Sequence, residues 1–100
     1  MHLVHARLRT PLGRSAPPEL ANLLRTHAED LDALEHVSVH PSRSNEVTVG
    51  VFSLSRTLLE AEGRAAALLR RTVQAEPALA GFAVLSVGAA LIPGPWWGLD

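Results

Sequence analysis

The chain has 100 residues, of which 47% are hydrophobic, and it carries a formal net charge of −1 at pH 7. These values fit one domain with a largely aliphatic core, and the near-neutral charge provides no overall attraction to nucleic acid or to an anionic membrane. The absence of Cys excludes disulfides, thiolate metal sites and cysteine nucleophiles.

The first part of the chain predicts a strand followed by a helix. Residues 2–9 alternate between two faces, and the face expected to be buried carries His2, Val4, Ala6 and Leu8. Ser15 is a suitable N-cap, and Pro17 and Pro18 follow it in the first turn. Together they predict a helix that runs to about Glu35. The apolar stripe of this helix consists of Leu20, Leu23, Leu24, Leu31 and Leu34.

Two further strands joined by a turn are predicted next. Residues 36–40 and 46–54 alternate in polarity, and residues 41–45 between them are rich in turn formers. The inward side chains are those of Val37, Val39, Val47, Val49 and Val51. The outward ones are those of His36, Ser38, His40, Thr48, Phe52 and Leu54. Gly50 lies on the outward face, where it allows a close approach of another group or a bulge.

At Ser55 the period changes from 2 to 3.6 residues, which predicts a second helix over about residues 56–75, capped by Ser55. Its inner stripe consists of Leu58, Ala61, Ala65, Leu69 and Val73. Residues 82–90 predict a last strand that is apolar on both faces, so we expect another surface to cover its outer side. Residues 92–100 predict an extended arm.

This order of elements, strand–helix–strand–strand–helix–strand, resembles the ferredoxin-like (split βαβ) fold over nearly the whole chain. The resemblance implies an α+β domain over residues 1–91, followed by the arm. It also implies a four-stranded antiparallel sheet in the order 4-1-3-2 with two helices on one face. The resemblance is one of architecture, and the fold hosts many unrelated activities.

The sheet face without helices is the first candidate site. Its polar and aromatic candidates are His5, Arg7, His36, His40, Thr48 and Phe52. If this face were bare, Phe52 and its apolar neighbours would expose a large patch, so we expect a homodimer with the two sheets face to face. The alternative is a ligand or partner site, with Arg7 as an anchor for a carboxylate or phosphate.

The histidines of this face do not predict a metal site within one subunit. His36 and His40 are four residues apart on a strand, which at ~3.3 Å per residue places them ~13 Å apart, too far to share an ion. His5 is separated from both by the intervening central strand. We therefore expect no metal and no cofactor, and a site bridging two subunits stays open.

His27 lies near the middle of the leucine stripe of the first helix, an unexpected place for a polar residue. One interpretation is a partly buried histidine that hydrogen-bonds a backbone, Ser or Thr group. The other comes from the dimeric α/β-barrel relatives of this fold, small monooxygenases and cyclase-like enzymes among them, in which a histidine between helices and sheet serves as acid or base. Only Glu62, at the margin of the second helix, offers a carboxylate to orient the imidazole.

Trp96 and Trp97 lie in the arm, and each offers about 200 Å² of largely apolar surface. Such surface is costly to leave in water. Two alternatives stay open: the arm folds back over its own domain, or it reaches over a neighbouring subunit or an external partner.

These patterns predict a small cytoplasmic accessory, binding or regulatory module that forms a homodimer through its open sheet face and its arm, with a small molecule or a protein as a further partner. The start of the chain lacks the long apolar run of a secretory signal, and the apolar run after Pro77 is too short and interrupted for a membrane anchor. A single outward aromatic on the central strands argues against RNA binding. The competing hypothesis is a cofactor-free enzyme of the dimeric α/β-barrel type, which acts on an apolar metabolite with His27 or a sheet-face histidine as acid or base.

Overall fold

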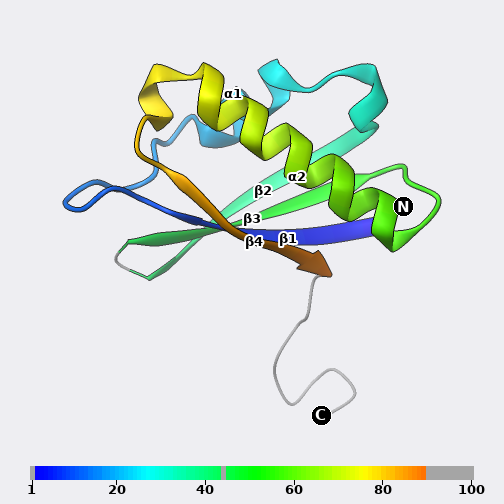
Figure 1. The fold of residues 1–100 in the computed structure, drawn as a ribbon, viewed down its shortest axis with the longest axis horizontal. Coiled ribbons are helices and arrows are strands. Elements are labelled where there is room, and N and C mark those ends of the chain that lie inside the picture. Colours follow the sequence, from blue (N-terminus) through cyan, green and yellow to red (C-terminus); the bar gives the residue numbers. More distant parts are fainter. Residues whose placement is uncertain (1, 44, 90–100) are drawn as a thin grey trace, which may run out of the picture.

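Four strands and two helices alternate in the order βαββαβ in the computed structural model, which describes residues 2–43 and 45–89 (Figure 1). The strands are β1 (His2–Arg9), β2 (Leu34–Arg43), β3 (Glu46–Ser53) and β4 (Ala83–Ala89). The helices are α1 (Leu20–His27) and α2 (Leu58–Ala75), and two 3-10 helices, η1 (Asp30–Asp32) and η2 (Pro77–Leu79), precede β2 and β4.

The strands form one antiparallel sheet in the order β2-β3-β1-β4, which is the predicted order 4-1-3-2 counted from the other edge. Figure 1 shows both helices on the same side of this sheet. The predicted fold class is therefore confirmed: the domain has the ferredoxin-like arrangement of elements. The predicted arm, with Trp96 and Trp97, lies outside the described residues.

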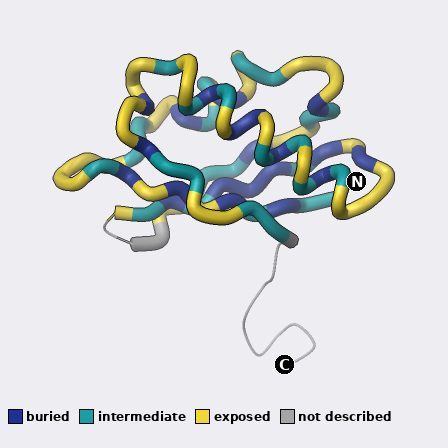
Figure 2. The backbone as a smooth tube through the Cα atoms, in the orientation of Figure 1, coloured by how far each residue is buried: buried dark blue, intermediate teal, exposed yellow. Residues whose placement is uncertain are grey.

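The core lies between the sheet and the helices, and the period of each element decides which residues reach it (Figure 2). The sheet contributes alternate residues, with Val4, Ala6 and Leu8 fully buried on β1 and Val49 fully buried on β3. The helices contribute Leu20, Leu24, Ala61, Ala65, Leu68 and Leu69. Two small residues of the predicted inner stripe of α2, Ala61 and Ala65, are buried in this core.

The prediction that the first helix extends to about Glu35 is wrong. α1 ends at His27, whose backbone carbonyl accepts a hydrogen bond from Nη2 of Arg71 at 2.9 Å. The side chain of Asp32 then accepts the backbone N–H of Glu29 at 2.7 Å and closes the short η1. A carbonyl at the end of the helix is thus satisfied by a side chain of α2 instead of a further helical turn.

The early end of α1 redistributes the predicted leucine stripe. The helix begins at Leu20, so the prediction of Ser15 as its N-cap is wrong. Leu24 is completely buried, whereas Leu31 in η1 is 80% exposed. Leu34 packs against the core from β2 rather than from a helix. Helical spacing does not predict which residues are buried beyond the point where the helix ends.

The second helix begins two residues later than predicted. Thr57 is its N-cap, and its hydroxyl accepts a hydrogen bond from the backbone N–H of Glu60 at 3.1 Å. The hydroxyl of Ser55, the predicted cap, instead hydrogen-bonds that of Ser53 at 2.9 Å in a buried position. With this start, Leu58 is 38% exposed and is not part of the inner stripe.

β4 begins one residue after the predicted Phe82, and Ala90 lies outside the described residues. The register shifts within β4: Leu8 of β1 pairs with Val84, while its neighbour Arg7 pairs with Ser86. Leu85 is therefore the extra residue of a bulge. Because of this bulge, two valines at an odd spacing, Val84 and Val87, both pack against the core.

Candidate functional site

The sheet face opposite the helices, called the open face below, carries rows of residues that run across the strands. Three rows contain the candidate residues. Read from β2 towards β4, they are His36–Phe52–Leu3, Ser38–Gly50–His5–Gly88 and His40–Thr48–Arg7–Ser86. A fourth row beside the last of these includes Glu46, Arg9 and Ala83. All six candidates that the sequence placed on this face occur in the rows, as the alternation of the strands predicted. The three rows of candidates differ in chemistry, and each is described in turn.

The first row is a ridge of apolar surface. The rings of His36 and Phe52 lie against each other, with centroids 6.0 Å apart and planes tilted by 53°. Leu3 pairs with Phe52 across the next strand boundary, and both are half-buried. The helices described in the structure lie on the other side of the sheet from this row (Figure 1).

The middle row contains a glycine, Gly50, that a neighbouring side chain covers. A Cβ atom at Gly50 would lie 2.5 Å from the hydroxyl oxygen of Ser38, so the serine side chain occupies the space above the glycine. The pairing of β3 with both neighbours is regular at this position. Of the two alternatives foreseen for Gly50, the structure therefore shows a close approach and not a bulge. Beyond His5 the row continues with a second glycine, Gly88.

The third row is polar, and an ion pair joins it to the neighbouring residue Glu46 of the next row. Nη2 of Arg7 lies 3.2 Å from Oε1 of Glu46, and the arginine side chain is 52% exposed. Such an exposed pair contributes about 0–1 kcal/mol to stability. The predicted anchor for an external carboxylate or phosphate therefore already has a carboxylate beside it, and an anionic ligand would have to compete with Glu46.

The three histidines of the open face do not form a cluster. His36 and His40 are exposed on the edge strand β2, and His5 lies on the central strand β1 beyond β3. Among the described side chains, no group of three or more His, Asp or Glu is placed to hold a metal ion.

His27 has a carboxylate partner that the sequence did not identify. Its Nε2 atom lies 2.6 Å from Oε2 of Glu76, and the two side chains are 24% and 23% exposed. The suggested partner, Glu62, lies elsewhere, in a groove between α2 and β4. Glu76 is the residue that ends α2, 49 positions along the chain, and no local pattern connects it to His27.

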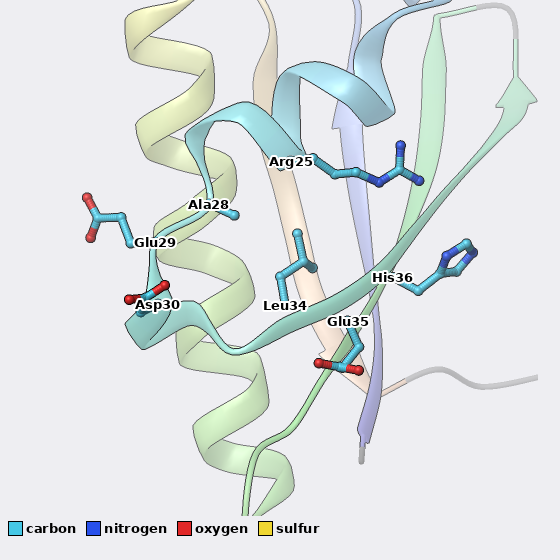
Figure 3. A pocket seen from close by; sticks show the side chains of 7 residues that line it. All are labelled: Arg25, Ala28, Glu29, Asp30, Leu34, Glu35 and His36. Atoms are coloured by element: carbon cyan, nitrogen blue, oxygen red, sulfur yellow. The ribbon is translucent and has the colours of Figure 1, made fainter.

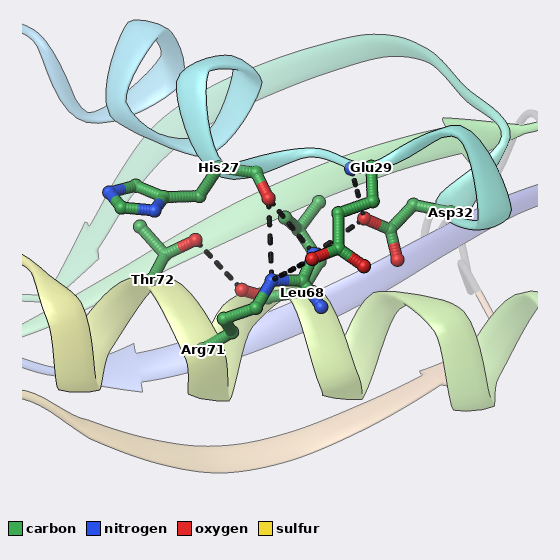
Figure 4. Close-up of polar contacts among 6 residues, drawn as sticks. All are labelled: His27, Glu29, Asp32, Leu68, Arg71 and Thr72. Carbon is green, nitrogen blue, oxygen red and sulfur yellow. Dashed lines mark hydrogen bonds and ion pairs between the residues drawn. The ribbon is translucent and has the colours of Figure 1, made fainter.

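The backbone of His27 belongs to a second polar cluster (Figure 4). Arg71 donates from Nη2 and Nε to the His27 carbonyl at 2.9 and 3.3 Å, and Nη2 also contacts Oδ2 of the buried Asp32. The carboxylate of Glu29 is 3.9 Å from the Arg71 Nε. These contacts tie the end of α1 and η1 to α2. We therefore assign the cluster a structural role.

One cavity of about 330 Å³ opens where α1 ends and β2 begins (Figure 3). Its lining includes Arg25, Glu29 and His36 but not His27. In Figure 3 the side chains of Arg25 and His36 extend to the same side, whereas Glu29 points to the opposite side. Arg25 is held by Oδ1 of Asn22 at 2.9 Å. The polar groups of this cavity therefore do not converge on a single point.

Comparison of the chain with protein-family models, curated proteins and solved structures finds no match. Within residues 2–43 and 45–89, no helix has the length and apolar character needed to cross a bilayer.

Proposed function

We propose that this protein is a small accessory, binding or regulatory module that self-associates through the open face of its sheet, with the sheets of two copies face to face. The observation that supports this most directly is the ridge of Leu3, Phe52 and His36, which carries no helix layer. Leu3 and Phe52 are adjacent and half-exposed, and apolar side chains that gather on a surface can mark an interaction site.

The order of the rows also suits a symmetric contact. The row of Leu3 and Phe52 lies beside the row in which Ser38 covers Gly50. When two copies of one surface meet about a two-fold axis, the apolar row of each copy can lie against the neighbouring row of the other. The polar and charged rows with His40, Arg7 and Glu46 then lie to one side of the apolar contact, where charged and polar groups set the orientation of the partners.

Substitution of Phe52 by Ser tests this proposal. The substitution removes the largest side chain of the ridge, so we expect the dissociation constant of the face-to-face contact to rise at least about tenfold. Sedimentation equilibrium measures this, and far-ultraviolet circular dichroism checks that the fold is kept. The control is Leu12→Ser, because Leu12 is 98% exposed in a loop and does not lie on the sheet. Equal dissociation constants for Phe52→Ser and the wild type would contradict the proposal.

The arm is part of this proposal through Trp96 and Trp97, which are the protein's only tryptophans. If they take part in the contact, their fluorescence should shift to shorter wavelength as the protein concentration rises, because association removes indole rings from water. A spectrum that does not change between the monomer and the assembly would remove the arm from the interface.

The second candidate function is a cofactor-free enzyme of the dimeric α/β-barrel type that acts on an apolar metabolite, and the His27–Glu76 contact favours it. A carboxylate that orients an imidazole is a common acid–base arrangement. Against this candidate, His27 lines none of the cavities described among residues 2–43 and 45–89. Nuclear magnetic resonance with a library of small apolar ligands separates the two. Saturable shifts of the His27 imidazole would favour the enzyme, and shifts confined to the open face would favour the module.

A further inference from the structure

The two outer strands of the sheet differ in how their free edges are protected. Free strand edges invite pairing with other chains, and proteins protect them with proline, charged residues or irregular backbone. β2 has all three protections: Pro41, the exposed Glu35, and two register irregularities. β4 has no proline and no charged residue, only the bulge at Leu85. Among the described residues, no strand pairs with the outer edge of β4.

A groove of about 290 Å³ runs between this edge and α2. Its lining includes the small residues Gly63 and Ala66 of α2, which leave the helix backbone accessible. Leu59 and Leu85, at the same groove, are 79% and 36% exposed. Apolar surface of α2 therefore lies directly beside the edge of β4. A molecule that pairs with this edge would also contact the helix, which increases the contact area.

Two opposite charges lie in this groove, Glu62 and Arg70. They are eight residues apart on α2, which at 1.5 Å per residue separates them by ~12 Å along the helix axis, so they do not pair with each other. None of the ion pairs among the described side chains involves either residue. The groove thus has a negative end and a positive end, with Ala66 midway between them.

We propose that this groove and the edge of β4 bind a second copy of the chain, edge to edge, about a two-fold axis beside Ala66. That rotation reverses the direction of α2, so Glu62 of each copy faces Arg70 of the other, and the opposite charges are matched twice. The β4 edges of the two copies then run antiparallel and join the two sheets. Because this rotation brings each charge of the groove opposite the opposite charge of an identical groove, a second copy of the chain is the partner that fits it.

The layer geometry agrees with this arrangement. α2 packs against both β1 and β4. An axis midway over these two strands would lie about half a strand spacing, ~2.4 Å, inside the edge strand. With ~4.8 Å between two paired edge strands, the two copies of α2 would be ~9.6 Å apart. Packed helices are separated by about 8–10 Å, so the helices touch when the strands pair. The glycine and alanine of the groove face this helix–helix contact.

Charge reversal tests the proposal without touching the core. Glu62→Arg and Arg70→Glu each place like charges opposite one another twice, so each should raise the dissociation constant of the edge contact about tenfold or more. The double variant Glu62→Arg/Arg70→Glu exchanges the charges and should restore the constant to within about threefold of the wild type. Arg56→Glu is the control, because Arg56 is exposed and lies outside the groove. Sedimentation equilibrium measures all four variants.

The outcomes separate this contact from the face-to-face one. If Phe52→Ser leaves a dimer that Glu62→Arg dissociates, the edge contact is established independently of the open face. If Phe52→Ser alone yields a monomer, or if the double variant is as weak as the single ones, the edge proposal is overturned. A monomeric wild type whose β4 amides are protected from hydrogen exchange also overturns it, because another part of the chain then covers the edge.

Discussion

The two faces of the sheet are built by alternate residues of the same strands, and they have opposite chemistry. On β3, Val47, Val49 and Val51 are at most 3% exposed beneath the helices. Thr48 and Phe52, between and beyond them, are half-exposed on the other side. The difference shows that the helices of this two-layer domain cover one face of the sheet and leave the other without a helix layer. The covered face accounts for the stability of the fold, and the open face is where we look for function.

The largest expected effect comes from truncation on the covered side. Leu24→Ala removes a completely buried side chain of α1 and should reduce the free energy of unfolding by about 2–5 kcal/mol. Leu31→Ala is the matched control, because the sequence assigns both leucines to one stripe but Leu31 is 80% exposed. Its expected effect is within about 0.5 kcal/mol. Urea denaturation measures both, and equal losses would mean that Leu31 is buried after all.

A smaller and more direct test uses two neighbours on β3. Val49→Ala and Thr48→Ala each remove two heavy atoms, but the first acts on the covered face and the second on the open face. We expect Val49→Ala to cost about 2 kcal/mol, from lost burial and the cavity left behind, and Thr48→Ala to cost less than about 0.5 kcal/mol. The measurement is urea denaturation of dilute protein, so that association does not contribute. Equal costs would show that the open face is as tightly packed as the core.

The smallest expected effect concerns Gly50. Alanine here would press its Cβ atom against the hydroxyl of Ser38, 2.5 Å away, so Gly50→Ala should reduce the free energy of unfolding by about 1 kcal/mol. In a Ser38→Ala background the same change should be neutral or stabilising, because the hydroxyl is gone and alanine suits a strand better than glycine. A thermodynamic cycle of the four proteins measures this coupling. Additive effects would mean that Ser38 does not occupy the space above Gly50.

Elements whose residues repeat regularly could be predicted from the sequence. β1 was predicted with its observed bounds, and Val4, Ala6 and Leu8 of its predicted inner face are buried, while His2 at the strand's start is half-buried. The open-face candidates followed by the same rule, because outward residues of adjacent antiparallel strands share a face. The role of that face stays a prediction.

Features decided by contacts between distant residues could not be predicted. α1 ends at His27 because Arg71, 44 residues away, bonds its carbonyl. The carboxylate beside the His27 ring comes from Glu76, which no spacing rule connects to α1. Both residues lie near the end of α2, and only the packing of the two helices brings them to His27.

The sequence by itself determined the order of the elements and the division of the strands into a covered and an open face, and the resemblance to the ferredoxin-like fold implied the antiparallel sheet. The order and the division depend on local periods of 2 and 3.6 residues, which every segment carries within itself. Only the tertiary structure decided where α1 stops, how a bulge at Leu85 turns two valines to the core, and that the strand without proline or charge lies at a sheet edge beside a charged groove. Those features arise from the meeting of segments far apart in the chain, and no local pattern records which segments will meet.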